Sequence, residues 1–349
     1  MGEARVGLIG YGHGGAVFHA PLVRATDGMV LAAIVTSDSG RRARAGREHP
    51  SARILPDAES LWQQAADLDL VIVSSPNRTH VPLGMAALGH GLPVVIDKPM
   101  AATVQDARSL VEEAERRALL LTVFQNRRWD GDFLTVRRLL AEHRLGDVFR
   151  FESRFERWRP TPRSGWRERG DPHEAGGLLY DLGSHLIDQA LVLFGPVTHV
   201  YAELDKRRAG VEVDDDAFVA LTHASGVRSH LWMTALAAQT GPRLRVLGTT
   251  AAYVKHGLDL QEDALNEGAD PADPAFGQDP VDRWGTISSG AVVHTIQTEA
   301  GVYRHFYRAV LSALRNRTAP PVDPRDAVRT LGIVEAARRF ASATAPSAL

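Results

Sequence analysis

The sequence predicts a doubly wound α/β domain with a parallel sheet, followed by an α+β domain with a large, mostly antiparallel, open-faced sheet. Three observations lead to this prediction. The chain has 349 residues, which is long enough for two domains. Its first third alternates short apolar runs with helical patterns, which is typical of a parallel sheet. Beyond about residue 124, strand-like runs follow one another without helices between them, which is typical of an antiparallel sheet.

The first domain, placed at residues 1–124, contains apolar runs of strand length separated by helical patterns. The runs lie at 6–9, 29–35, 70–74, 94–96 and 119–124. The helical patterns lie at about 14–25 and at 39–48, 82–89 and 103–118. Wholly apolar strands must be covered on both faces, so we expect a parallel sheet whose ligand lies at the carboxyl ends of its strands.

The second domain, placed at residues 125–349, begins with a run in which Phe149, Phe151 and Phe155 alternate with charged residues. This run covers 148–158, and similar runs lie at 199–204, 217–223, 228–234 and 244–247. A helix at 178–193 interrupts them, and the Gly-, Pro- and Asp-rich segment 266–282 predicts a loop. Helices at 303–315 and 324–341 close the chain, and the sequence leaves open whether the last one packs back on the first domain.

The composition excludes several classes of protein. A net charge of −2 and a pI of about 6.7 give no reason to expect a nucleic-acid or anionic-membrane partner. The absence of cysteine removes disulfides, thiolate metal sites and cysteine nucleophiles, and it fits a reducing compartment. The N-terminus lacks the pattern of a signal peptide, and no window reaches the roughly 18 to 20 apolar residues of a membrane span. We therefore expect a soluble, cytoplasmic protein.

A glycine-rich turn follows the first predicted strand and begins the first predicted helix. Its sequence is Gly10-Tyr11-Gly12-His13-Gly14-Gly15, which satisfies G-x-G-x-x-G. Gly10 allows the tight turn, Gly12 lets the backbone approach a pyrophosphate, and Gly15 lets helix and strand pack closely. In this context the motif predicts a dinucleotide-binding Rossmann domain, with Gly10, Tyr11, Gly12 and Gly15 at the cofactor.

The end of the second predicted strand bears on the choice between NAD and NADP. The fingerprint expects an acidic residue there for an unphosphorylated ribose. This chain has Thr36 and Ser37, with Arg41 and Arg42 just beyond, and hydroxyl and guanidinium groups suit a 2′-phosphate. The sequence thus favours NADP over NAD. Two alternatives stay open: Asp38 is the acidic residue in a shifted register, and the arginine pair is simply an exposed helix face.

Three further motifs carry a family resemblance. Ser75-Pro76-Asn77-Arg78-Thr79-His80 follows the third apolar strand, and Asp97-Lys98-Pro99 follows the fourth. Later the chain reads Gly176-Gly177-Leu178-Leu179-Tyr180-Asp181-Leu182-Gly183-Ser184-His185-Leu186-Ile187-Asp188. In this order, behind the glycine turn, they closely resemble the glucose–fructose oxidoreductase, inositol dehydrogenase and rhizopine-catabolism (Gfo/Idh/MocA) family over nearly the whole chain. Phe18-His19-Ala20-Pro21 is similar to a branch that includes NADP-dependent scyllo-inositol dehydrogenases.

The resemblance implies that Lys98, Asp181 and His185 are catalytic. An ammonium at Lys98 can stabilise the alkoxide that forms as hydride leaves, and a histidine can exchange the hydroxyl proton. Whether Asp181 pairs with Lys98 or orients the substrate stays open. Most members have Glu where this chain has Asp97, and the Lys98–Pro99 bond resembles one that is often cis.

Weaker site predictions complete the set. We expect Ser75, Pro76, Asn77 and His80 to line the cofactor crevice, together with Lys98. Four residues are predicted at the substrate: Arg127, Trp166, Arg167 and Tyr180. Asp181, His185 and Asp188 could form a metal cluster, but nicotinamide chemistry with a lysine and a histidine needs no Lewis acid, so no metal is predicted. Asp188 is expected to hold its helix in place.

The resemblance implies an enzyme that transfers hydride between nicotinamide and a ring hydroxyl or ketone of a polyol or sugar-like substrate, an inositol or a pyranose. A reductase of a non-sugar carbonyl or dihydrodiol is one alternative, and a non-catalytic dinucleotide-binding sensor is another. The open sheet face predicts a homodimer or homotetramer, with the apolar side of 149–155 as the contact surface.

Overall fold

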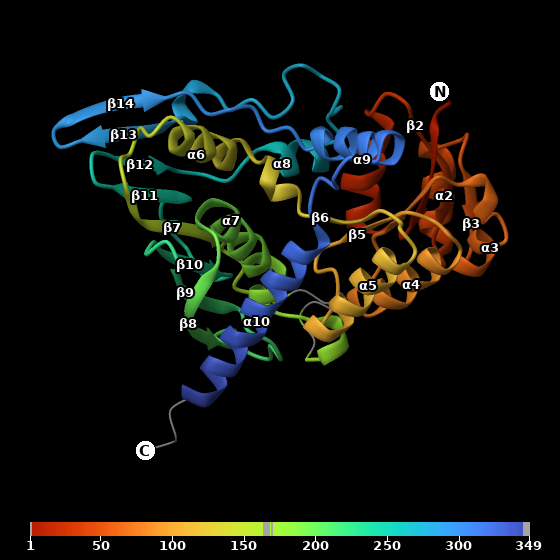
Figure 1. The fold of residues 1–349 in the computed structure, drawn as a ribbon, viewed down its shortest axis with the longest axis horizontal. Helices are drawn as coiled ribbons and strands as arrows, with labels where there is room; N and C mark the ends of the chain where they lie inside the picture. Colours follow the sequence, from red (N-terminus) through yellow and green to blue (C-terminus); the bar gives the residue numbers. More distant parts are fainter. Residues whose placement is uncertain (1, 163–167, 169, 345–349) are drawn as a thin grey trace. The chain divides into compact units, whose positions relative to one another are not determined.

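The computed structural model describes residues 2–162, 168 and 170–344 (Figure 1). Trp166 and Arg167, two predicted substrate residues, lie outside the described residues. The chain forms two compact units. The first comprises Met1–Asn126, Gln261–Phe276 and Val302–Val328, and the second comprises Arg127–Leu260, Gly277–Gly301 and Arg329–Leu349. Among the described residues, no helix combines the length and apolarity needed to cross a membrane.

The first unit contains a six-stranded parallel sheet in the order β3-β2-β1-β4-β5-β6, which confirms the doubly wound α/β prediction. The strands are β1 Ala4–Ile9, β2 Met29–Val35, β3 Arg53–Leu55, β4 Leu70–Val73, β5 Val94–Asp97 and β6 Leu121–Phe124. The order reverses between β1 and β4, and the crevice beyond the carboxyl ends of such strands is where doubly wound sheets bind ligands. The sequence analysis missed β3, whose three half-buried residues are too short for a periodic pattern.

Helices of the first unit follow most of the predicted pattern, but the short helices at 58–62 and 261–266 were not predicted. The α-helices are α1 Ala20–Arg24, α2 Ser39–Glu48, α3 Ala58–Trp62, α4 His80–Gly89, α5 Val104–Arg116, α8 Gln261–Asn266 and α9 Arg304–Asn316. The segment η1, Gly14–His19, is a π-helical turn instead of the predicted α-helix. Packing joins the late helix α9 to the early one α1. Phe124 of β6 meets Phe306 of α9 with ring centroids 5.0 Å apart, so the core of this unit includes distant sequence.

The second unit contains an eight-stranded sheet in the order β14-β13-β12-β11-β7-β10-β9-β8. The strands are β7 Val148–Glu156, β8 Val197–Asp205, β9 Asp216–His223, β10 Arg228–Thr234, β11 Leu244–Gly248, β12 Ala252–Lys255, β13 Gly285–Ser289 and β14 Val292–Ile296. Among the described strands of this sheet, only β7 and β10 pair in parallel, so the mostly antiparallel prediction is confirmed. The sequence analysis missed β12 to β14, which are short and only partly buried.

One face of this sheet packs on α7, Ser184–Phe194, which lies beside β7 and β10 (Figure 1). Phe151 meets Phe194 of α7 with ring centroids 5.4 Å apart. Phe151 and Phe155 are fully buried, so the prediction that the apolar side of 149–155 forms an exposed surface is wrong for them. The other helices of the unit are α6 Gly131–Ala141 and most of α10 Pro324–Thr344.

Candidate active site

The glycine turn after β1 is shaped by close backbone contacts. Gly10 has φ of +102°, and a Cβ there would lie 2.1 Å from the carbonyl oxygen of Ser74. A Cβ on Gly15 would lie 2.0 Å from the carbonyl oxygen of Gly10, so the helix and strand can approach only at glycine. Around Gly12, by contrast, the nearest atom to an added Cβ is Arg41 Nη1, at 3.8 Å. The turn therefore leaves open backbone where a pyrophosphate would approach.

The buried side chain of Tyr11 links this turn to Glu48 and His49. Its side chain is buried, and its hydroxyl donates to Glu48 Oε2 at 2.6 Å and lies 2.9 Å from His49 Nε2. Burial, then the hydrogen bond and charge of Glu48, raise the pKa of the Tyr11 hydroxyl. The Tyr11 side chain joins the turn to the end of α2, while its backbone stays in the motif.

The end of β2 gathers the residues predicted to choose the cofactor. Thr36 is buried and Ser37 is exposed. Arg42 Nη1 donates to the carbonyl oxygen of Ser37 at 2.6 Å, which places its guanidinium at this strand end. Asp38 caps α2, because its Oδ1 accepts from the backbone N–H of Arg41 at 2.7 Å. The one acid of this segment thus serves a helix N-terminus, a common role for aspartate.

The turn after β4 contains the Ser75 to His80 motif. Ser75 and Thr79 hydroxyl oxygens lie 2.6 Å apart, and Asn77 is buried. His80 is also buried, with Nδ1 2.8 Å from the carbonyl oxygen of Pro99 and Nε2 2.9 Å from that of Ser75. Because both ring nitrogens face backbone carbonyls, His80 joins two strand-end turns instead of presenting its ring to a cofactor as predicted. Burial lowers the pKa of its imidazole despite the nearby Asp97.

Lys98 follows β5 directly, and two contacts hold its turn. Its backbone N–H donates to Asp97 Oδ1 at 2.8 Å, and His80 faces the next carbonyl. The Lys98–Pro99 bond is cis, as the resemblance implied. The chain has only three lysines against 37 arginines. Lysine is therefore a rare residue in this chain, and one of the three follows β5 directly.

In the second unit, Asp181 and His185 lie on consecutive helical segments. Asp181 belongs to η7, Leu179–Gly183, a π-helical turn where a continuous α-helix was predicted, and His185 belongs to α7. Turns of this kind are rare and often occur at functional sites. The Leu179 N–H donates to Asp214 Oδ2 at 2.7 Å, and the Leu178 N–H donates to the Asp214 carbonyl at 2.9 Å.

Asp214 packs tightly against Gly177, the residue just before Leu178. Gly177 has φ of +97°, and a Cβ there would lie 2.2 Å from Asp214 Oδ1. Burial of Asp214 raises the pKa of its carboxyl, although the Leu179 N–H and the charge of Arg338 act against this. Asp214 thus fixes the start of the segment that carries Asp181.

A second set of buried contacts fixes the position of α7. Arg128 Nε and Nη2 each donate to an oxygen of Asp188 at 2.7 Å, and both side chains are mostly buried. The prediction that Asp188 holds its helix is thereby confirmed. Gln189, the next residue, donates through Nε2 to the Arg127 carbonyl at 2.8 Å and accepts from Arg243 Nη2 at 3.1 Å.

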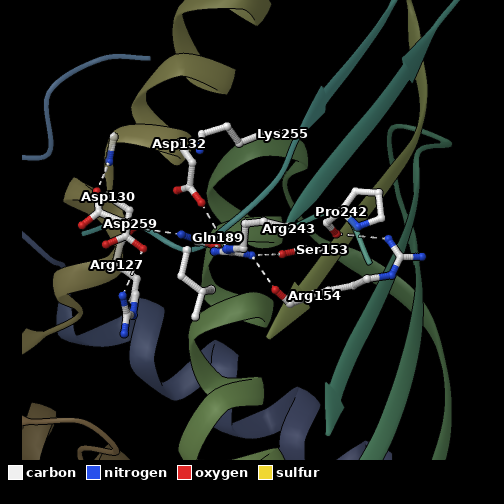
Figure 2. Close-up of polar contacts among 12 residues, drawn as sticks. Arg127, Asp130, Asp132, Ser153, Arg154, Gln189, Pro242, Arg243, Lys255 and Asp259 are labelled. Carbon is white, nitrogen blue, oxygen red and sulfur yellow. Dashed lines mark hydrogen bonds and ion pairs between the residues drawn. The ribbon is translucent and has the colours of Figure 1, made fainter. Parts of the chain in front are cut away.

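Figure 2 shows Arg243 at the centre of this set, where it also contacts Ser153 and Asp132. Arg127, predicted at the substrate, is 6% exposed; its guanidinium lies 5.0 Å from the Phe155 ring centre and 3.5 Å from Asp130. Tyr180, also predicted there, is buried with Arg338 5.5 Å from its ring centre.

The first unit thus brings together the glycine turn, Ser74, His80 and Lys98, and the second brings together Asp181, His185, Tyr180 and their supports. Among the described residues, no group of three or more acidic, histidine or cysteine side chains could hold a metal. The sequence analysis gave no role to Ser74, His19, Tyr307, Asp214 or Arg243. His19 stood within a quoted motif, but the partners of the others are distant in sequence, and no local pattern marks them.

Comparison with known proteins identifies both parts of the chain. Residues 4–125 match the oxidoreductase family NAD-binding Rossmann fold, and residues 137–348 match the oxidoreductase family C-terminal alpha/beta domain. The uncharacterized oxidoreductase YdgJ of Escherichia coli is 39% identical over 95% of this chain and 94% of its own. The NADP(+) scyllo-inositol 2-dehydrogenase IolW of Bacillus subtilis is 35% identical, covering 95% of this chain and 92% of its own.

A solved structure agrees with these matches. The Bacillus subtilis oxidoreductase YvaA superposes with a TM-score of 0.93 at 34% identity, covering 98% of this chain and 97% of that one. The two domain matches, the relatives and the Rossmann geometry lead to one conclusion: the chain is a nicotinamide-dependent oxidoreductase and belongs to the Gfo/Idh/MocA family.

Proposed function

We propose that this protein is an NADP-dependent dehydrogenase that interconverts a ring hydroxyl and a ring ketone on a polyol or sugar-like substrate. The observation that carries the proposal is the placement of Lys98 beside the glycine turn. A Cβ on Gly14 would lie 2.8 Å from Asp97 Oδ2, and the same carboxylate accepts from the Lys98 N–H. The similarity to IolW supports a polyol as substrate.

The preference for NADP rests on the end of β2. The guanidinium of Arg42 lies at this strand end, and Arg41 Nη1 lies near Gly12. Asp38 accepts from a helix N–H instead of presenting its carboxylate to a ribose. Guanidinium groups bind phosphate with paired, charge-assisted hydrogen bonds, so this arrangement fits a 2′-phosphate. The open backbone at Gly12 fits the pyrophosphate of either cofactor.

Each proposed catalytic residue has a distinct task. When bound, the nicotinamide accepts or supplies the hydride. The Lys98 ammonium donates a hydrogen bond to the substrate oxygen and stabilises the negative charge that develops on it. His185 takes the hydroxyl proton during oxidation and returns it during reduction. Asp181 orients the substrate or pairs with Lys98. Arg127 and Tyr180 act on the substrate only indirectly. Tyr180 packs within η7, and the Arg127 carbonyl binds Gln189 of α7, so both help to hold the segments that carry Asp181 and His185.

The test measures turnover of a panel of inositols and aldoses with NADP and with NAD. The absorbance of the reduced nicotinamide reports the rate. We expect turnover of at least one ring polyol, with a higher kcat/KM for NADP. Turnover restricted to dihydrodiols or non-sugar carbonyls would replace the substrate class. Cofactor binding without turnover of any substrate, unchanged by Lys98→Ala, would favour a sensor.

We also propose that the protein is a homodimer or homotetramer that pairs through the open face of the eight-stranded sheet. That face carries an aromatic group: Phe218 and Trp232 have ring centroids 5.1 Å apart, and the Arg154 guanidinium lies 4.0 Å from the Trp232 ring. Arg154 also contacts Glu152 and Glu156, and such mixed charge can pair with a second copy of itself about a two-fold axis. A monomer by light scattering at micromolar concentration would contradict the proposal, and Trp232→Glu should produce one.

A further inference from the structure

The carboxylate of Asp97 contacts residues from three segments of the first unit. Its Oδ1 accepts the backbone N–H of Lys98, and its Oδ2 accepts the hydroxyl of Ser74 at 3.0 Å. Oδ2 also lies 3.5 Å from Nε2 of His19, at the end of η1. The position is crowded, because a Cβ on Gly14 would fall 2.5 Å from Ser74 Oγ. Asp97 therefore links the turns after β1, β4 and β5.

The contact to His19 continues to a second buried residue. His19 Nδ1 lies 2.5 Å from the hydroxyl oxygen of Tyr307, on α9. His19 and Tyr307 are both 0% exposed. A carboxylate offers only acceptors, so a hydrogen on Nε2 faces Asp97, and Nδ1 shares the second hydrogen bond with the Tyr307 hydroxyl.

The charges in this cluster are consistent with that arrangement. Burial alone would raise the pKa of Asp97, but the hydrogen bond and charge of His19, with the charges of His80 and Lys98, hold it well below its usual range. Burial, with the charge of Asp97, raises the pKa of the Tyr307 hydroxyl well above its usual value. Asp97 is thus a carboxylate and Tyr307 a neutral phenol at physiological pH.

We infer that His19 and Tyr307 are positioning residues for Lys98. They act through Asp97, which holds the backbone N–H of Lys98 and thereby the place from which its side chain extends. Full burial keeps both residues from touching a substrate. The inference rests on the proposed function in one respect, since it takes Lys98 to be the catalytic lysine.

The chain offers a direct way to observe Lys98. Its only lysines are Lys98, Lys206 and Lys255, so protein labelled with ¹³C-lysine gives three Cε–Hε signals, which single Lys→Arg variants assign. We expect His19→Leu and Tyr307→Phe to move the Lys98 signal and leave the Lys206 and Lys255 signals in place. This measurement needs no substrate, so it stands apart from the proposed function.

Kinetics provide the second measurement. A small displacement of a catalytic group can cost up to about 100-fold in rate, so we expect His19→Leu to lower kcat by about tenfold or more and Tyr307→Phe by less. The Kd for NADP should stay within about twofold, because the cluster holds the lysine turn. His19→Gln can restore a donor toward Asp97 and should recover part of the loss. Tyr253→Phe is the matched control, since Tyr253 is a buried tyrosine of the second unit with no hydrogen-bond partner for its hydroxyl in the described structure.

The inference is overturned if the Lys98 signal and kcat of folded Tyr307→Phe and His19→Leu match those of the parent. It is also overturned if the Kd for NADP rises while the Lys98 signal does not move, since the cluster would then support only the glycine turn. If His19→Leu does not fold, Tyr307→Phe decides alone. A moved Lys98 signal, combined with normal kcat in Lys98→Met, would instead refute the proposed function and leave the coupling intact.

Discussion

The two units hold their proposed catalytic residues by different means. In the first unit, Lys98 follows a strand directly, and its neighbours Ser74 and Asp97 lie at the ends of parallel strands. In the second unit, His185 lies on a helix that is fixed by buried charged and polar side chains from other elements, among them Arg128 and Arg243. A parallel sheet aligns its strand ends by itself, whereas a helix packed on a sheet can slide unless specific contacts stop it.

A feature common to both units is a π-helical turn at the predicted site. One turn, η1, follows the glycine motif and ends at His19, and the other, η7, contains Asp181. Such turns widen a helix by one residue and are frequent at functional sites. In the first unit, strand ends linked through Asp97 hold the turn of Lys98, while in the second a buried ion pair and its polar neighbours hold the helix of His185.

The largest expected effect is on the buried ion pair of the second unit. Asp188→Ala leaves the Arg128 guanidinium buried without its carboxylate, which typically destabilises a protein by about 3–5 kcal/mol. The free energy of unfolding in urea measures this loss. The control is Asp205→Ala, which breaks an exposed pair with Arg207 and should cost less than about 1 kcal/mol. Equal losses for both variants would show that buried charge has no special part in this unit.

The next effect concerns catalysis in the first unit. Lys98→Met removes the ammonium that stabilises the developing alkoxide, and loss of one such donor costs about 10²–10³-fold in kcat. Steady-state kinetics and the Kd for NADP measure this, and the Kd should change little because the glycine turn is intact. Lys206→Met, at an exposed position, should behave as the parent. A kcat near that of the parent in Lys98→Met would contradict the assignment.

A smaller effect is expected at the end of β2. Replacing both Arg41 and Arg42 with Ala removes the guanidinium groups proposed to bind the 2′-phosphate, and we expect the Kd for NADP to rise about tenfold. The Kd for NAD should stay within about twofold, since NAD lacks that phosphate. Fluorescence titration with NADP and with NAD measures both Kd values. A parallel rise in both Kd values would mean that the arginines support the backbone and not cofactor choice.

The smallest effect contrasts two carboxyls whose pKa values shift in opposite directions. The pKa of Asp97 is lowered, so its contribution to stability is present above its unfolded pKa of 3.8 and is lost as the pH falls below that value. The pKa of Asp214 is raised, so its contribution is present below pH 3.8 and is lost as the pH rises through its folded value.

Urea unfolding across acidic pH checks the contrast. The stability difference between the parent and Asp97→Asn should shrink as the pH falls below 3.8. The difference between the parent and Asp214→Asn should move the other way and grow in favour of the parent as the pH falls from neutrality toward 3.8. Parallel pH profiles for the two variants would remove this distinction between the units.

The first unit was largely predictable from the sequence, and its exceptions are informative. The predicted bounds of β2 and α2 match the structure, because seven apolar residues and a capped ten-residue helix each give a strong local pattern. The short strand β3 and the π-helical form of η1 were missed. A three-residue strand has no periodicity, and a π-turn differs from an α-helix by one residue per turn in its hydrogen bonds, which composition does not report.

In the second unit, strands with polar and apolar alternation were found, while the short strands β12 to β14 and helix α6 were not. Alternation also failed to say which face is covered: Phe151 and Phe155 are buried on the side of α7, and the half-buried aromatic residues Phe218 and Trp232 belong to other strands. The period of a strand identifies two faces, but only packing decides which one is buried.

The sequence by itself determined the Rossmann pattern and the glycine turn, and it marked Lys98, Asp181 and His185 as candidates, because apolar periodicity, the conformational freedom of Gly10 and contiguous motifs are local properties. The tertiary structure alone decided what surrounds them. His19 and Tyr307 are separated by 288 positions, and Arg243 reaches Gln189 across 54. Such contacts form only when the folded chain buries these polar groups together and each must find a partner, and no local pattern encodes which partner that is.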